Sequence, residues 1–243
     1  MGPEKFGTDD YRYIGTELEL FAHATNWKSY FSRALKPYVR GRVLEVGAGA
    51  GANTRFLLNA DVAEWTALEP DQELYCSLNA HLQSLGDWRL SALKGAVAEL
   101  DSRELFDTIL YIDVLEHIED DLAELESTAR RLKPGGSLVV LSPAHQFFFS
   151  EFDRSIGHYR RYNRSSLLRL TPPALKLTKI WYLDSIGCIA SCANKIILRQ
   201  STPTLKQILF WDRVLVAISR FADPMVGNTI GKSIVAVWTA LPH

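Results

Sequence analysis

Three glycines within five residues are the most informative feature of the sequence. The apolar run Val43–Val46 leads into the turn Gly47–Gly51, and a stretch compatible with a helix starts at Asn53. Glycine is needed where a backbone turns tightly and approaches a ligand, and such turns before a helix hold ligand groups. About twenty residues later, Glu69 ends another apolar run. A carboxylate at the end of this second strand can accept hydrogen bonds from the hydroxyl groups of a ribose. These features predict a cofactor that contains a nucleoside.

A second segment, residues 152–164, carries four arginines among aromatic rings, and we call it the acceptor clamp. Guanidinium groups bind carboxylates or phosphates through paired hydrogen bonds and stack on planar groups, so the segment is predicted to bind an acceptor. A solvated basic loop is the alternative, and an ion pair from Asp153 would make part of the cluster structural. The residues assigned to acceptor binding here are Tyr159, Arg160, Arg161 and Tyr162.

Three of the six histidines, His117, His145 and His158, follow predicted strands or lie in the acceptor clamp. Imidazole exchanges a proton near neutral pH, so these three are the candidates for a catalytic base, with a structural role as the alternative for each. A carboxylate cluster with the spacing of a metal-dependent enzyme is not recognisable, and no metal is predicted.

The hydrophobic pattern predicts the elements that position these residues. Strands are expected near 43–46, 64–68, 90–93, 108–112 and 137–141, and helices near 53–59, 72–85 and 120–132. Because strands that are apolar on both faces alternate with helices, the pattern predicts an α/β fold with a parallel sheet between helices. Ligands bind at the carboxyl ends of such strands.

The remaining segments extend this plan. A helix is predicted over 16–38, a strand over 176–182, two helices over 185–198 and 205–221, and an antiparallel last strand over 232–240. We expect a single domain, 1–243, whose parts are an N-terminal helical lid (1–40), a cofactor-binding half (41–142), a substrate-clamp insertion (143–172) and C-terminal strands with a helical cover (173–243).

Composition limits the partners. The formal net charge of −1 gives no overall attraction to nucleic acid or anionic lipid. The three cysteines form no plausible disulfide framework, and no secretion signal or membrane span is recognised. We therefore expect a cytoplasmic protein that acts on a small molecule and binds no nucleic acid.

Four segments, in order, resemble the motifs of the seven-stranded S-adenosylmethionine-dependent (class I) methyltransferases. They are Glu45–Gly51, Leu68–Asp71, Phe106–Ile118 and Leu132–Leu138. The first also matches the dinucleotide pattern G-x-G-x-x-G/A, but dehydrogenases lack the set of four, and no tyrosine here begins the Tyr-x-x-x-Lys of short-chain dehydrogenases. The resemblance implies a doubly wound, mostly parallel seven-stranded sheet with an antiparallel last strand.

The resemblance also implies ligand roles. The glycine turn approaches the methionine part of S-adenosylmethionine, Glu45 holds its ammonium group directly or through water, and Glu69 binds the ribose. Asp71 is a weaker candidate, since it could instead cap the next helix. The residues assigned to the cofactor, with its product S-adenosylhomocysteine, are Glu45, Gly47, Ala48, Gly49, Gly51, Asn53, Glu69, Pro70, Asp71, Ala96, Val97, Asp113 and Val114.

Residues 17–30 and the acceptor clamp resemble a bacterial subgroup that acts on small-molecule or lipid-linked acceptors. In related enzymes the amino-terminal helix lies over the cofactor, which makes Trp27, Lys28 and Tyr30 lid candidates, or else packing residues. The two C-terminal helices are predicted to cover the pocket, with an amphipathic surface resting on a membrane as the alternative.

These observations predict methyl transfer from S-adenosylmethionine to an oxygen, of a hydroxyl or carboxylate, or to a nitrogen of a small anionic or aromatic metabolite. Transfer to a hydroxyl would use a histidine base, whereas a carboxylate would need none. The alternatives are an NAD(P)-dependent oxidoreductase, or a non-catalytic S-adenosylmethionine-binding or membrane-associated subunit.

Overall fold

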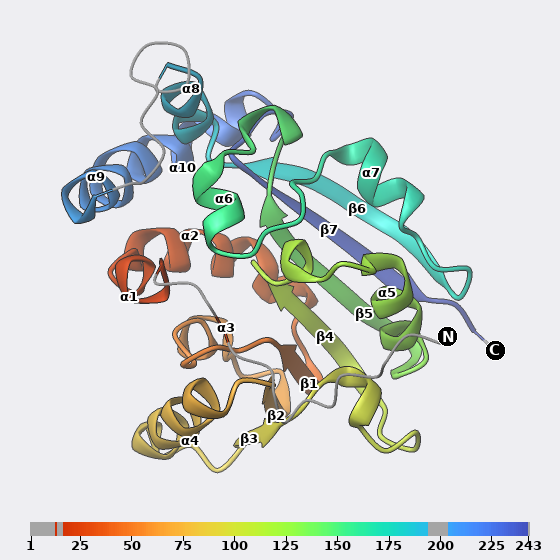
Figure 1. Ribbon diagram of the computed structural model, residues 1–243. Coiled ribbons are helices and arrows are strands. Elements are labelled where there is room, and N and C mark those ends of the chain that lie inside the picture. Colours follow the sequence, from red (N-terminus) through yellow and green to blue (C-terminus); the bar gives the residue numbers. More distant parts are fainter. Residues whose placement is uncertain (1–12, 14–16, 194–203, 243) are drawn as a thin grey trace, which may run out of the picture.

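The computed structural model describes residues 13, 17–193 and 204–242. Within these residues seven strands form one sheet in the order β3-β2-β1-β4-β5-β7-β6 (Figure 1). The strands are β1 (Gly41–Val46), β2 (Val62–Glu69), β3 (Leu90–Lys94), β4 (Phe106–Ile112), β5 (Leu132–Pro143), β6 (Leu175–Leu183) and β7 (Ser233–Ala240).

The strand pairing confirms the fold class. Strands β1 to β5 pair in parallel, whereas β7 runs antiparallel to both β5 and β6. The chain order reverses beside β1, whose neighbours are β2 and β4. At such a switch point the connections leave in opposite directions, which opens a crevice at the carboxyl ends of the strands.

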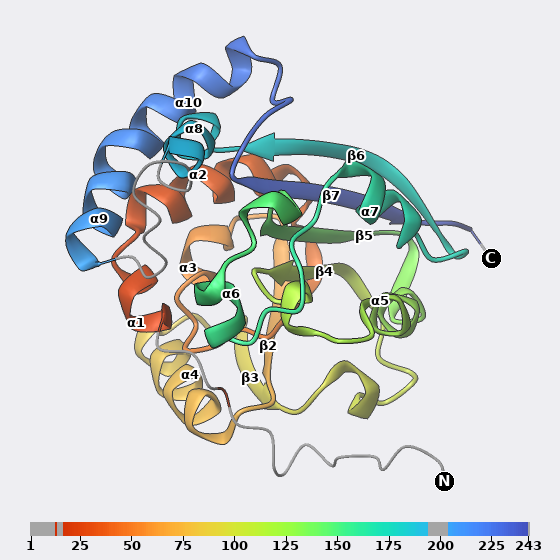
Figure 2. The same cartoon turned by 45° about the horizontal axis from the view of Figure 1, so that its top comes forward.

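Helices cover both faces of the sheet (Figure 2). They are α1 (Glu17–Ala22), α2 (Thr25–Leu35), α3 (Thr54–Leu57), α4 (Gln72–Leu85), α5 (Asp121–Ala129), α6 (Glu151–Ser155), α7 (Arg164–Arg169), α8 (Ser185–Ala193), α9 (Leu205–Phe210) and α10 (Val216–Met225). Short 3-10 turns lie at Lys36–Tyr38, Val97–Glu99, Leu115–His117 and Gln146–Phe148, and a π-helical turn, Trp211–Leu215, joins α9 to α10.

Alternating strand residues separate the core into two layers. Val43 and Trp65 pack with α2, α3, α4 and α10 on one face, whereas Leu44 and Tyr111 pack with α5 and α7 on the other. Burial on both faces explains why the central strands are continuously apolar in the sequence.

The N-terminal helix differs from its prediction as a single helix over 16–38, because it is split after Ala22. The break has a remote cause. Asp212 accepts hydrogen bonds from the backbone N–H groups of Asn26 and Trp27, at 3.2 and 2.8 Å. A carboxylate that caps free N–H groups starts a helix anew, so α2 begins at Thr25.

Other boundaries shift modestly. The helix expected over 53–59 covers only Thr54–Leu57, and the one expected over 205–221 continues to Met225 through the π-helical turn. The helix expected over 185–198 is seen to Ala193, and its last residues lie outside the described residues. In the described part of the chain, no helix has the length and apolar character needed to cross a membrane.

Candidate cofactor and acceptor site

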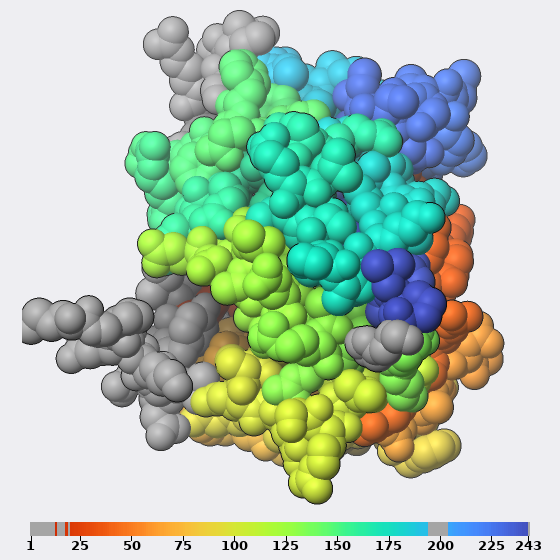
Figure 3. All heavy atoms as spheres, turned by 90° about the vertical axis from the view of Figure 1, so that its right-hand side faces the viewer, coloured from red at the N-terminus to blue at the C-terminus, as the bar shows by residue number. Residues whose placement is uncertain are grey.

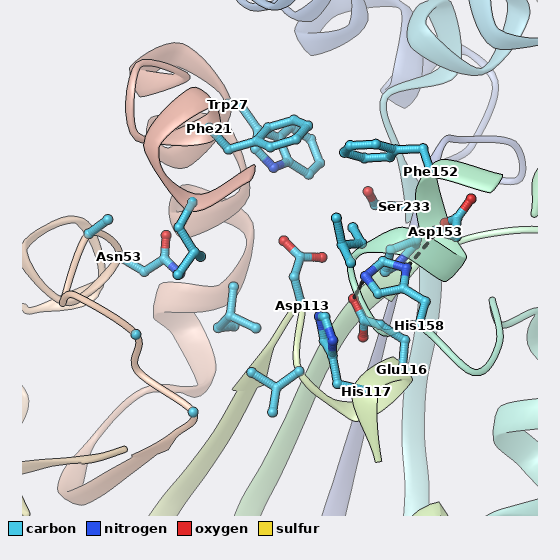
Figure 4. Close-up of a pocket in the computed structure, with 18 of the residues that line it drawn as sticks. Phe21, Trp27, Asn53, Asp113, Glu116, His117, Phe152, Asp153, His158 and Ser233 are labelled. Carbon is cyan, nitrogen blue, oxygen red and sulfur yellow. Dashed lines mark hydrogen bonds and ion pairs between the residues drawn. The ribbon is translucent and has the colours of Figure 1, made fainter. Parts of the chain in front are cut away.

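One cavity of about 1770 Å³ lies at the carboxyl ends of β1, β2, β4 and β5. Its walls also include α1, α2, α6, α8 and α9. Figure 4 shows Phe21, Trp27 and Phe152 on one side of it. Ligand pockets usually measure roughly 300–1,000 Å³, so this cavity has room for a nucleoside cofactor and a second molecule. We call the part near the glycine turn the donor half, and the part near the 3-10 turn after β4 and the acceptor clamp the acceptor half.

The glycine turn adopts a backbone that only glycine supports easily. Gly47 has φ +64° and Gly49 has φ +56°, both in the left-handed region. A Cβ atom on Gly47 would lie 2.8 Å from two methyl groups of Val114, closer than real Cβ atoms approach. The turn therefore passes directly over the end of β4, and Gly47 and Gly49 line the cavity.

Glu69 joins this turn to the end of β2. Its Oε2 accepts from Gly49 N at 2.8 Å and its Oε1 from Asp71 N at 3.0 Å. The carboxylate lines the cavity, and burial raises its pKa. Each carboxylate oxygen can accept a further hydrogen bond, so Glu69 retains capacity for hydroxyl groups of a ligand.

Glu45 lies behind the turn and not among the cavity walls, and its contact with the ammonium group, directly or through water, stays a prediction. It is 1% exposed, and its Oε2 accepts from Thr54 Oγ1 at 2.6 Å and from Trp65 Nε1 at 3.1 Å. Burial raises the pKa of Glu45 to about 7. By holding Thr54, the first residue of α3, Glu45 fixes the far end of the glycine turn.

Two cofactor assignments need correction. Asp71 Oδ1 accepts from Glu73 N and Leu74 N, so it caps α4, and it does not line the cavity. Gly51 packs against α4, where an added Cβ would meet Leu78 at 2.9 Å. Both residues shape the donor half from outside.

The other residues assigned to the cofactor line the cavity: Ala48, Asn53, Pro70, Ala96, Val97, Asp113 and Val114. Asp113 stands where the two halves meet, with φ +55° and its side chain exposed to the cavity. The surrounding walls reduce its hydration and raise the pKa of its carboxyl group.

In the acceptor half, His158 is held by Asp153 of α6 (Figure 4). His158 Nδ1 lies 3.1 Å from Asp153 Oδ1, and His158 Nε2 lies 3.9 Å from Glu116 Oε1. Burial alone would raise the pKa of Asp153, but hydrogen bonds from His158, Arg161 and Ser150 hold it well below its usual value. Since Asp153 is ionised, Nδ1 of a neutral His158 carries the proton and donates, which leaves Nε2 as the acceptor.

His117 packs edge-on against His158, with ring centroids 4.4 Å apart. Burial and the neighbouring His158 lower the pKa of His117 to about 3. Glu116 is fully buried beside them, and burial raises its pKa well above the usual value. Both residues line the cavity.

Arg161 also reaches the cavity, but mainly as a partner of Asp153. Its Nε and Nη2 donate to the two oxygens of Asp153 at 2.8 and 3.0 Å, and Ser150 donates to the same carboxylate. The structural ion pair that the sequence left as an alternative is therefore present within the acceptor clamp.

The other clamp residues assigned to acceptor binding, Tyr159, Arg160 and Tyr162, lie outside the cavity walls, which corrects their assignment to direct acceptor contact. Arg160 Nη1 pairs with Asp121 at 2.6 Å, and the buried Tyr162 donates to the same carboxylate at 2.8 Å. Tyr159 is half exposed on the outer surface.

Two more predicted site residues are structural. His145 does not line the cavity; its ring stacks on Tyr182 at 5.0 Å and its Nε2 lies 3.0 Å from Gly231 O. Tyr30 points away and donates to Asp223 at 2.6 Å. Trp27 and Lys28, by contrast, do line the cavity, and burial lowers the pKa of Lys28 to about 8.

Sequence reasoning missed several wall residues that come from distant segments: Tyr13, Leu18, Phe21, Trp211 and Lys232. Lys232 Nζ lies 4.9 Å from the centre of the Trp211 ring, and reduced hydration lowers its pKa. Lysine at a predicted strand start gives no local sign of this position.

Glu116, His117 and His158 each offer one ligand atom, and these atoms lie within 4.8 Å of one another. This spacing would allow a single cation to be held. The absence of a metal stays a prediction.

Comparison with known proteins identifies the family. A family model described as a methyltransferase domain matches residues 20–186. A ubiquinone biosynthesis O-methyltransferase of Parvibaculum lavamentivorans is 32% identical over 111 residues, 45% of this chain and 43% of that protein. A tRNA U34 carboxymethyltransferase of Pseudoalteromonas atlantica is 26% identical over 121 residues, 48% and 38% of the two chains. The matches thus span less than half the length of these two relatives.

Solved structures share the fold at low identity. A chain of the complex between the Haloferax volcanii Trm112 methyltransferase activator and a methyltransferase superposes with TM-score 0.62 and 18% identity, covering 95% of this chain and 98% of that one. The N-methyltransferase NodS of Bradyrhizobium japonicum, in complex with S-adenosyl-L-homocysteine, gives TM-score 0.55 and 15% identity over 90% and 87%. The oxidoreductase alternative is not favoured. The chain belongs to the methyltransferase domain family.

Proposed function

We propose that the protein transfers the methyl group of S-adenosylmethionine to a hydroxyl oxygen of a small aromatic acceptor, with His158 as the base. One observation carries the proposal. The ion-paired Asp153 orients His158, and the Nε2 atom of that ring faces the acceptor half beside Glu116 (Figure 4). A base held by a carboxylate is the arrangement that removes a proton from a weakly acidic hydroxyl.

The donor half would hold the cofactor. In this proposal Gly47 and Gly49 bring backbone close to the methionine part, Glu69 accepts from the ribose hydroxyls, and Ala96 and Val97 border the adenine. S-adenosylmethionine supplies an activated methyl group, so the enzyme chiefly aligns the acceptor and excludes water. Trp27 and Phe21, from α2 and α1, support that role because they close the cavity from the side opposite the sheet (Figure 4).

His158 suits the role of base better than the other two histidines proposed from the sequence. His145 lies outside the cavity walls. His117 has a pKa of about 3, and a base that weak takes up little of the proton of a hydroxyl at neutral pH. Its neutral ring instead packs against His158 and limits that ring's rotation.

In the proposed mechanism, His158 Nε2 would take the proton of the acceptor hydroxyl, and the cofactor held in the donor half would supply the methyl group and leave as S-adenosylhomocysteine. The charge that develops on the imidazolium is stabilised by Asp153, which stays ionised because Arg161 also donates to it. After product leaves, solvent removes the proton from His158.

The walls of the acceptor half support an aromatic acceptor that is neutral or anionic. Phe152 and Trp211 offer flat apolar surfaces, while Arg161 and Lys232 bring positive charge. An oxygen acceptor agrees with the similarity to the ubiquinone biosynthesis O-methyltransferase of Parvibaculum lavamentivorans. A tRNA acceptor is less well supported, because the chain has a net charge of −1 and its cavity walls are largely apolar.

Methyl transfer to a carboxylate is the second candidate, favoured by Arg161 and Lys232 in the wall. The two differ in their need for a base. Hydroxyl transfer predicts that His158→Gln lowers kcat by about 100-fold or more, whereas carboxylate transfer predicts little change.

The test is a screen of isotopically labelled methyl transfer from S-adenosylmethionine into aqueous and lipid extracts, read by mass spectrometry. The proposal is supported if the label appears in a methyl ether that survives mild alkali and if His158→Gln abolishes this labelling. Label in an alkali-labile ester or in tRNA would contradict it. Calorimetric titration with S-adenosylhomocysteine checks that the variant keeps its cofactor site.

A further inference from the structure

The outer side of the C-terminal helices carries a continuous stripe of exposed apolar side chains. Along α9, the π-helical turn and α10 these are Phe210, Val214, Ile218, Phe221 and Met225. Their spacing of three or four residues places them on one side of the helical segment. Phe221 is 78% exposed and Met225 is 86% exposed, far from the burial that such side chains normally gain.

The stripe lies on the outside of the molecule. In Figure 2 α9 and α10 form one band along the outer edge, with α8 and α2 on its inner side. In Figure 3, a view from the side of β6, the blue residues near the end of the C-terminal helices form a corner of the molecule. Ile189 of α8, 62% exposed, extends the apolar surface next to α10.

The positive and negative side chains of these helices lie on different sides. Lys206, Arg213 and Arg220 recur every seven residues, which places them along one flank of the apolar stripe. From Ser185 to the end, the sequence contains only two carboxylate side chains, Asp212 and Asp223. Both are buried and face inward.

The inward acids have structural partners. Asp212 caps α2 through Asn26 and Trp27. Asp223 accepts from Tyr30 Oη at 2.6 Å and from the backbone N–H of Asp184 and Ser185, at 2.6 and 2.9 Å. The described C-terminal helices therefore present cations and apolar groups to solvent but no carboxylate.

The stripe also borders the cavity. Phe210 is both exposed on the outer side and part of the cavity wall, and Lys206 and Trp211 of the same segment line the wall. Gly187, Ala190 and Ser191 of α8 complete this part of the wall. A surface that rests on these helices would thus adjoin the acceptor half.

We propose that this stripe, Phe210–Met225 with Ile189, is a docking surface for a membrane that contains anionic lipid. Apolar side chains flanked by cations are what an interfacial helix needs to enter the headgroup region. A protein partner would need acidic groups facing the same flank, and it is an outcome that the test distinguishes. The docked enzyme would open its cavity toward acceptors dissolved in the bilayer. This proposal does not depend on the proposed reaction, because membrane docking requires neither a catalytic base nor a particular acceptor.

Vesicle flotation tests the surface directly, with the full chain and no acceptor. We expect the wild type to float with vesicles of 70% phosphatidylcholine and 30% phosphatidylglycerol, and much less with pure phosphatidylcholine. Phe221→Ser with Met225→Ser should lower binding by about tenfold or more, because apolar area no longer enters the interface. Neither residue lines the cavity, so cofactor binding should be unchanged.

Matched controls separate this surface from general effects. Trp88, 86% exposed between α4 and β3, serves as the apolar control, and Trp88→Ser should float like the wild type. Arg213→Glu should weaken binding by about tenfold, whereas Arg130→Glu at the end of α5 should not. Absence of flotation by the wild type would overturn the proposal. Flotation of the Phe221/Met225 variant equal to that of the wild type would also overturn it. A third contradicting result would be a wild type that forms a concentration-dependent dimer and binds no vesicles, with the dimer lost in this variant.

Discussion

The donor and acceptor halves share one cavity but are built by different means. The donor half consists of tight turns at the ends of neighbouring strands, where backbone geometry decides the shape, as at Gly47 and Gly49. The acceptor half consists of side chains from α6, the 3-10 turn after β4 and the start of β7, held together by Asp153. A cofactor site of this kind depends on local backbone, whereas an acceptor site depends on a network assembled from distant segments.

The donor half should be the more sensitive to a single added carbon. Gly47→Ala places a Cβ in the left-handed region and against Val114, so we expect affinity for S-adenosylmethionine to fall by about 100-fold. Gly86→Ala is the matched control, since Gly86 has nearly the same φ, +63°, with nothing within 4 Å of the added Cβ. Calorimetric titration should show unchanged affinity for the control. Equal affinity in both variants would mean that the turn does not touch the cofactor.

Glu69 should contribute next most to cofactor binding. Glu69→Gln replaces a charge-assisted hydrogen bond to the ribose and weakens the link to Gly49, so the dissociation constant should rise between about tenfold and 100-fold. Asp71→Asn is the control: it removes the charge of a residue that caps α4 outside the cavity. This variant should lower the free energy of unfolding and leave cofactor affinity unchanged. Unchanged affinity of the Glu69 variant in calorimetry would remove the ribose assignment.

Neighbouring arginines test the acceptor half. Arg161→Gln should lower kcat/KM for the acceptor by about tenfold or more, because Asp153 loses the partner that keeps it ionised beside His158. Arg160→Gln breaks the pair with Asp121 and the hydrogen bond to Glu119 O, both outside the cavity walls, and should leave kcat/KM unchanged. Steady-state kinetics decides between them. A similar loss in both variants would place the whole acceptor clamp in one structural unit.

The last predicted effect lies behind the turn and concerns stability rather than binding or turnover. Burial raises the pKa of Glu45 from about 4.5 to about 7, so the neutral form favours folding, and this contribution is lost as pH rises through 7. Glu45→Gln has no such titration. Relative to the wild type, its free energy of unfolding should therefore increase by about 2 kcal/mol between pH 5 and pH 8. Urea denaturation at the two pH values measures the difference, and no change would mean that Glu45 stays ionised throughout.

The fold and most of the donor half could be predicted from sequence because their signals are local. Apolar runs mark the strands, and the spacing from Gly47 to Glu69 marks the turn and the next strand end. Gly51 and Asp71 carried the same signals, yet one packs against α4 and the other caps it. Spacing identifies a turn but does not tell which of its residues face the ligand.

The acceptor half could be predicted only as a region. Arg160 and Arg161 are adjacent in the sequence, but one pairs outward with Asp121 and the other inward with Asp153. His145 follows a strand at the correct edge, yet it stacks on Tyr182. Trp211 and Lys232 reach the cavity from elements 50 and 71 residues beyond Arg161 in the chain. Such neighbours are set by tertiary packing, which one sequence without its structure does not show.

The central claim is that the donor half binds the cofactor and the acceptor half supplies the base. It is tested most directly by measuring cofactor affinity and kcat for the same two variants, Glu69→Gln and His158→Gln. The structure predicts that the Glu69 variant loses affinity for S-adenosylmethionine, while the His158 variant keeps wild-type affinity and loses about 100-fold in kcat for a hydroxyl acceptor. If His158→Gln lost cofactor affinity in parallel with kcat, or turned over at the wild-type rate, the assignment of methyl transfer to the acceptor half through His158 would be contradicted.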